Sequence, residues 1–166
     1  MFKPGLLLLT LLASAPARAD EAYWLRRLAA AQTPYEKGLA IETLTRYAGP
    51  KSISVLIEVL RNPDEPIPVR GAAARALGVI RGADATEAVV AFLFSLNGPK
   101  DALWHSTEWA VLDLARLGER DRVAAELERL GNPAPLSPAS RSIARILALT
   151  RSCARMLGDQ ESTGPF

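Results

Sequence analysis

The amino-acid sequence predicts an all-α fold, an α-solenoid in which about four antiparallel helix pairs stack side by side. Three observations favour this architecture. Apolar residues recur at helical spacing, a two-helix unit repeats along the chain, and the alternation of apolar and polar residues that is typical of strands is missing. Because one helix pair cannot bury its apolar faces alone, neighbouring pairs must supply the hydrophobic core.

The start of the chain is typical of a secretory signal peptide. Lys3 precedes an apolar run at residues 6–13, and the A-x-A-like sequence ARA occupies residues 17–19. The apolar run is far shorter than the roughly 20 residues that a transmembrane helix needs. We therefore expect a cleaved leader over residues 1–19, a periplasmic or secreted protein, and no membrane insertion after cleavage.

The charge of the mature chain argues against a nucleic-acid partner. The whole sequence has 20 Lys plus Arg against 18 Asp plus Glu, and two of the cations, Lys3 and Arg18, lie in the leader, which has no acidic residue. The mature chain is therefore balanced. It lacks the net positive field that draws proteins onto nucleic acids or anionic membranes.

Capping and helix-breaking residues set the expected boundaries of the helices. Thr33, Pro34 and Glu36 form the pattern of a capping box with proline at the first helical position, and Asp84 with Glu87 makes a weaker version. We expect one domain over residues 20–158 and a disordered polar tail over 159–166. The predicted helices span residues 21–31, 34–48, 51–61, 68–81, 84–96, 101–117, 120–130 and 138–157.

Two internal shifts reveal the repeat. A shift of 33 residues lays KGLAIETLTRYAG (37–49) over RGAAARALGVIRG (70–82), and SISVLIEVL (52–60) over ATEAVVAFL (85–93). A further shift of 37 residues carries Leu77 onto a leucine of the helix predicted at 101–117. Self-similarity at such a period is the signature of a repeat architecture.

The helix predicted at 68–81 is expected to touch neighbours on more than one side. Arg75 and Gly78 face away from its apolar stripe, and its many small residues let other helices approach closely. The stripe consists of Val69, Ala73, Ala76, Leu77 and Ile80.

Residues 56–93, LIEVLRNPDEPIPVRGAAARALGVIRGADATEAVVAFL, resemble a HEAT repeat and are similar to the short form found in bilin-lyase-like HEAT proteins. An apolar first helix is followed by an Asn-Pro-Asp turn, by Val-Arg opening an Ala-rich second helix, and by Leu-Gly-x-Ile. The resemblance is weaker over 34–55 and 101–131. It implies an α-solenoid that binds other macromolecules, and it implies that Arg70 braces the turn between the helices as a partner of Asp64.

The helix predicted at 138–157 fits the polar cap that ends a helical stack. Its apolar face includes Cys153, the only cysteine of the sequence. A buried thiol is favoured there over an intermolecular disulfide, since free cysteine is among the most buried residue types. Its arginines make a solvated face or, as the alternative, a site for an acidic partner; they are Arg141, Arg145, Arg151 and Arg155.

Catalytic and metal-binding motifs are scarce in the sequence. The only histidine is His105, no cysteine pair is present, and no glycine-rich phosphate loop occurs. Asp101, His105 and Glu108 share one helical face, but metal sites usually gather ligands from more than one element. We therefore expect no catalytic residue, no metal site and no cofactor.

A stripe of exposed residues on the second helices is the candidate partner-binding site. An aromatic residue with arginines on an exposed face is what interface hot spots favour, and the second helices of a solenoid line its inner surface. The alternative is that Trp109 packs against the next repeat. The stripe, called the ridge below, consists of His105, Trp109, Leu112 and Arg116 with their repeat counterparts Arg75, Val79, Glu42 and Arg46.

These features favour an exported, non-enzymatic scaffold that binds a protein partner through the second-helix face. One alternative is an enzyme or cofactor-handling factor of the bilin-lyase-like kind, which the resemblance implies. Another is a structural accessory subunit of an envelope complex, stable only when docked.

Overall fold

The computed structural model describes residues 20–131 and Ala148. The leader predicted at 1–19, the helix predicted at 138–157 with Cys153, and the tail predicted at 159–166 lie outside the described residues. The elements in chain order are α1 (Glu21–Ala30), α2 (Pro34–Leu44), α3 (Pro50–Arg61), α4 (Ile67–Ile80), α5 (Ala83–Ser95), α6 (Trp104–Leu114), the kinked turn η1 (Ala115–Glu119) and α7 (Arg120–Arg129).

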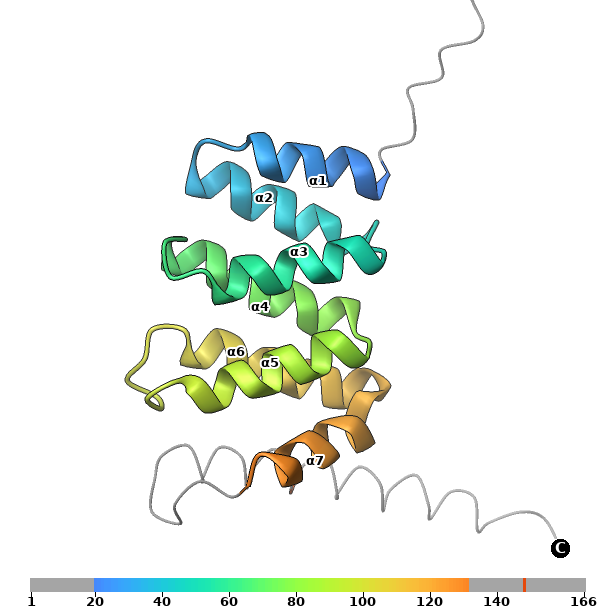
Figure 1. Cartoon of the computed structure of the whole chain (residues 1–166), viewed down its shortest axis with the longest axis vertical. Coiled ribbons are helices and arrows are strands. Elements are labelled where there is room, and N and C mark those ends of the chain that lie inside the picture. The colour runs from blue at the N-terminus through green and yellow to red at the C-terminus, as the bar shows by residue number, and fades with distance from the viewer. Residues whose placement is uncertain (1–19, 132–147, 149–166) are drawn as a thin grey trace, which may run out of the picture.

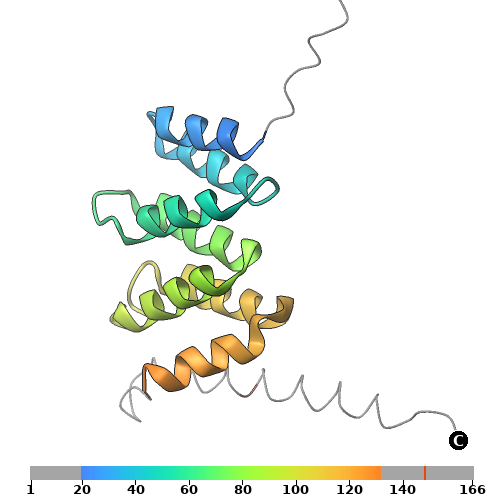
Figure 2. The same ribbon diagram turned by 45° about the vertical axis from the view of Figure 1, so that its right-hand side comes forward.

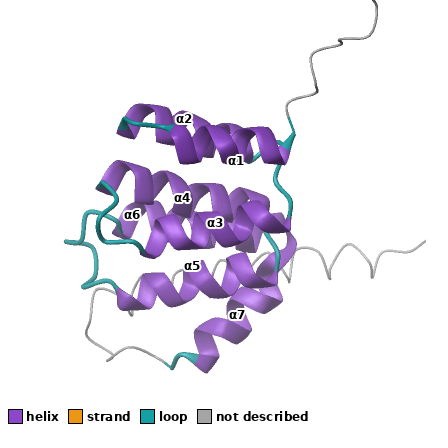
Figure 3. Ribbon diagram, turned by 45° about the horizontal axis from the view of Figure 1, so that its top comes forward, coloured by secondary structure: helices purple, strands orange, loops and turns teal. Residues whose placement is uncertain are grey.

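The helices form two layers of an α-solenoid, as the sequence predicts (Figure 1). α1, α3, α5 and α7 follow one another in the first-helix layer, and α2, α4 and α6 follow one another in the second-helix layer. α1, α3 and α5 also pack on the second helices of their own pairs, α2, α4 and α6 (Figure 2). The described part of the chain contains helices and loops but no strand (Figure 3). It holds three complete helix pairs and the first helix of a fourth.

The capping box predicted before α2 is present and fixes the start of that helix. The Thr33 hydroxyl accepts a hydrogen bond from the Glu36 N–H at 3.2 Å, and the Glu36 carboxylate accepts one from the Thr33 N–H at 3.1 Å. Hydrogen bonds from the Gln32 and Thr33 N–H groups hold the pKa of Glu36 below its ordinary value. The weaker box predicted at Asp84 and Glu87 is absent, because α5 starts after Gly82 and has no side-chain cap.

A carboxylate from α1 caps the start of α3 and joins the first two helix pairs. Glu21 Oε1 accepts hydrogen bonds from the Gly49 N–H at 2.9 Å, the Ser52 N–H at 2.7 Å and the Ser52 hydroxyl at 2.8 Å. Partial burial alone would raise the pKa of Glu21, but these hydrogen bonds lower it overall. The carboxylate also explains the glycine, since a Cβ at Gly49 would lie 2.6 Å from Glu21 Oε2.

The hydrophobic core runs between the two layers and is continuous from α1 to α7. The stripe predicted on α4 is buried at four of its five positions, and Ile80 is partly buried. Gly78, predicted to face away from the stripe, is also buried, because the backbone of α6 lies against it. An added Cβ there would meet Ala110 Cα and O at 2.9 Å. Glycine thus permits the close approach of α4 and α6.

The predicted helix at 101–117 is shorter in the structure and bends at its end. The Asp101 carboxylate accepts a hydrogen bond from the Leu103 N–H at 2.9 Å, and this turn delays the start of α6 to Trp104. α6 ends at Leu114, and Gly118 in η1 has a φ of 110°, a conformation that glycine adopts freely. Leu117, which lies in η1 beyond the end of α6, is 44% exposed.

Candidate functional site

The ridge predicted from the sequence lies on the second-helix layer, with members on α2, α4 and α6 and Arg46 and Arg116 just beyond the ends of α2 and α6. Seven of its eight residues are exposed and Leu112 is half-buried. The side chain of Trp109 is 54% exposed. The helix predicted at 138–157, which would follow α6 in the second-helix layer, lies outside the described residues, so the alternative that Trp109 packs against the next repeat stays a prediction. The ridge is thus one continuous surface over three helix pairs.

The repeat register arranges the ridge in rows that run across the three helices. The shifts of 33 and 37 residues place Leu39, Ala72 and Trp109 at equivalent positions, and they form an apolar row. One turn further along each helix the corresponding positions hold Glu42, Arg75 and Leu112. The next row holds Arg46, Val79 and Arg116. One row is therefore apolar, and each of the other two combines two charged residues with one apolar residue.

A groove between α2 and α4, the α2–α4 groove, hollows this surface, with a volume of about 620 Å³. That volume falls within the range of about 300–1,000 Å³ that is usual for binding sites. The groove includes three of the ridge residues, Glu42, Arg75 and Val79, together with Leu39 and Tyr35. Trp109, Leu112, Arg116 and His105 lie outside it on α6, and Arg46 lies outside it beyond α2. The structure thus divides the ridge into a groove and a flanking surface.

Small residues make the groove possible. Gly38 lines it from α2, and Ala72 and Ala76 line it from α4. An added Cβ at Gly38 would have nothing within 4 Å, so the space over this residue is open. The sequence reveals these residues only as small positions on helices, and no pattern in it separates a groove floor such as Gly38 from a helix contact such as Gly78.

Exposed apolar side chains lie on both walls of the groove. Tyr35 is 79% exposed and Leu39 is 49% exposed on α2, while Val79 is 46% exposed on α4. Apolar surface gathered in one concave place is what partner-binding sites show. The repeat register identifies Leu39 as the counterpart of Trp109, whereas no sequence pattern identifies Tyr35 as a site residue.

The charged residues of the groove have no partners within it. Glu42 and Arg75 line opposite walls, and neither makes an ion pair with a described residue. On the flanking surface, Arg116 lies 3.9 Å from the Asp113 carboxylate, and this pair is exposed to solvent. Exposed pairs of this kind contribute at most about 1 kcal/mol, so the charge of Arg116 stays available to a partner.

His105 is exposed on α6 and lies near one carboxylate. Its Nδ1 lies 3.8 Å from Glu108 Oε2, while the Asp101 carboxylate is engaged in the turn before α6. No group of three or more histidine, cysteine, aspartate or glutamate side chains converges among residues 20–131. Nor does any helix in that part of the chain have the length and apolar character to cross a membrane.

Arg70 braces the turn between α3 and α4, but through a different partner from the one implied by the resemblance. Its Nε donates a hydrogen bond to the Leu60 carbonyl at 3.0 Å, and its guanidinium lies 5.4 Å from the ring centroid of Phe92. The Asp64 N–H bonds to the side-chain oxygen of Asn62, and no ion pair between Asp64 and Arg70 forms in the described structure. The carbonyl at the end of α3 takes the role expected of Asp64.

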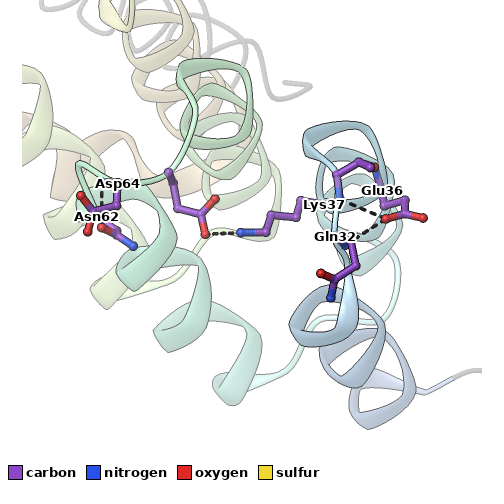
Figure 4. A network of polar contacts seen from close by, with 7 residues as sticks. Gln32, Glu36, Lys37, Asn62 and Asp64 are labelled. Atoms are coloured by element: carbon purple, nitrogen blue, oxygen red, sulfur yellow. Dashed lines mark hydrogen bonds and ion pairs between the residues drawn. The ribbon is translucent and has the colours of Figure 1, made fainter.

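An ion pair fixes α2 against the following helix pair beside the groove. Lys37 Nζ reaches from α2 to the Glu65 carboxylate in the loop between α3 and α4 (Figure 4). Gln32 and Glu36 lie on the other side of Lys37, in the capping network of α2 (Figure 4). These contacts position the wall of the groove that carries Leu39.

The comparison with known families agrees with this architecture. The family model described as HEAT repeats matches residues 21–96, from the start of α1 to the residue after α5. No curated protein and no solved structure matches the chain significantly. Outside the matched residues, α6 and α7 continue the same two layers. The antiparallel pairs, the shared core and the family match together show that residues 21–96 consist of HEAT repeats.

Proposed function

We propose that this HEAT-repeat protein is an exported, non-enzymatic scaffold that binds a protein partner through the ridge and the α2–α4 groove. HEAT repeats generally serve as scaffolds for protein interaction. The observation that carries the proposal is the exposure of Trp109, Leu39 and Val79 on the second helices. On the same layer, Glu42 and Arg75 make no ion pair with a described residue. Large aromatic residues on an exposed face are favoured as interface anchors.

The signal-like sequence at residues 1–19 supports export, and the balanced charge after it supports a protein rather than a nucleic-acid partner. Fractionation of the native cells, followed by N-terminal sequencing, tests the export. We expect the mature chain in the envelope or the medium, starting at Asp20. A chain that keeps Lys3 and stays inside the cell would contradict this part of the proposal.

Site-specific photo-crosslinking in the native cells tests the binding. A photo-reactive amino acid in place of Trp109 is expected to give a discrete adduct with a partner protein. The matched control is the same substitution at Glu58, which is exposed on the first-helix layer. The variants Trp109→Ala and Arg116→Ala are expected to weaken capture of that partner. Adducts that form equally at Glu58, or capture that both variants leave unchanged, would refute the binding role of the ridge.

A further inference from the structure

We propose that the α2–α4 groove docks an amphipathic helix of the partner protein, with an apolar stripe flanked by acidic residues on one side and basic residues on the other. The inference rests on the proposed scaffold function and names the chemistry of the partner segment. It follows from the lining, the length and the charges of the groove.

The lining of the groove favours a helix over an extended segment. Its floor is formed by Gly38, Ala72 and Ala76, which offer no side-chain donors or acceptors. An extended segment pressed against this floor would bury backbone N–H and C=O groups without partners, and each such group costs about 1–3 kcal/mol. A helix satisfies these groups internally and exposes only side chains to the groove. The small floor residues let such a helix approach closely.

The length of the groove sets the number of anchors. It extends along α2 from Tyr35 to Thr45, which at 1.5 Å per residue corresponds to about 15 Å, or nearly three helical turns. An amphipathic helix of this length presents apolar residues at positions i, i+4 and i+7. Tyr35, Leu39 and Val79 supply the exposed apolar surface that these anchors would cover.

The charged residues of the groove fix the orientation of the bound helix. Glu42 on the α2 wall and Arg75 on the α4 wall are 33 residues apart and therefore lie at the same level of consecutive repeats. A helix between them is flanked by a negative group on one side and a positive group on the other. Charges beside an apolar seam fix the partner and the orientation in helix pairing. The acidic flank of the occupant therefore faces α4, and its basic flank faces α2.

A peptide-display selection against the purified mature chain tests this inference. The library consists of random 16-residue peptides. We expect enriched peptides with apolar residues at i, i+4 and i+7, acidic residues along one flank and basic residues along the other. Their affinities for the protein and its variants are then measured by fluorescence polarisation with labelled synthetic peptides.

Three variants locate the binding. Gly38→Leu places a side chain in the open space of the groove. It is expected to lower the affinity of the enriched peptides by about tenfold or more, since it excludes their apolar anchor residues. Ala125→Leu introduces the same side chain at an exposed position of α7 and is expected to leave binding unchanged. Arg75→Glu is expected to weaken binding by about fivefold at low salt, and by less at 0.5 M NaCl, because salt screens the exposed charge. Circular dichroism of each variant reports whether the fold is kept.

The outcomes separate the inference from the scaffold function. Enriched peptides without helical spacing, or peptides that bind Gly38→Leu as tightly as the parent chain, would overturn the docking of a helix in the groove. If their affinity instead fell with Trp109→Ala, the binding site would be α6, and the scaffold function would stand. Selected peptides that respond to none of Gly38→Leu, Arg75→Glu and Trp109→Ala would overturn both.

Discussion

The substitution Gly78→Ala tests the close contact between α4 and α6 on which the second-helix layer depends. The added Cβ would lie 2.9 Å from Ala110 Cα and O and 3.1 Å from Ala110 Cβ. These are backbone or near-backbone atoms that a rotamer change cannot move. Overpacking of this kind costs about 1–3 kcal/mol, while replacing a helical glycine with alanine returns about 1 kcal/mol through helix propensity. We expect a net loss of stability of up to about 2 kcal/mol.

Gly38→Ala is the matched control for this prediction. Gly38 also lies inside a helix, but its added Cβ meets nothing within 4 Å. Only the propensity gain remains, so we expect Gly38→Ala to stabilise the chain by about 0.5–1 kcal/mol. Thermal and urea unfolding followed by circular dichroism measure both variants, and 1 kcal/mol corresponds to about 4 °C in Tm for a domain of this size. Stabilisation by both variants would show that α4 and α6 are not as close as the structure places them.

Three further predictions concern the core and the helix caps. Trp104→Ala should destabilise the chain by about 3–5 kcal/mol, because Trp104 is 1% exposed. Trp104→Phe should cost less, since the indole N–H has no hydrogen-bond partner to lose. The urea unfolding midpoints of the two variants test this difference. Glu21→Ala should cost about 1 kcal/mol at pH 7, since it removes the cap of α3. The pKa of Glu21 is lowered in the folded chain, so its carboxylate stabilises the fold above the ordinary pKa of 4.5. This stabilisation is lost as the pH falls through the lower pKa of the folded chain. The difference in unfolding free energy between Glu21→Ala and the parent chain should therefore shrink in unfolding curves recorded below pH 4.5. Thr33→Ala should lower the stability by about 1 kcal/mol through loss of the capping box, and a Tm equal to that of the parent chain would contradict it.

Much of the second-helix surface could be predicted from the sequence, because helical spacing and a repeat register fix which positions share a face. The exposure of Trp109, Arg75 and Val79 is the clearest case. The same reasoning overlooked Trp104, which lies about 100° around the helix from His105 and so outside the ridge. Trp104 precedes Thr107 by three residues and Val111 by seven, and this spacing, which places the three side chains on one face, was the available signal.

The sequence by itself determined the all-helical architecture, the pairing of helices, the capping box at Thr33 and the outward face of each second helix. These features depend on local propensity and on spacing within one helix, which a linear pattern contains. Only the tertiary structure decided that Gly78 is a contact and Gly38 an opening, that Glu21 caps a helix 28 residues away, and that Arg70 binds the Leu60 carbonyl instead of Asp64. The reason is physical: these outcomes depend on the distance between neighbouring helices and on which polar atoms meet across it, and the packing of the whole stack sets that distance.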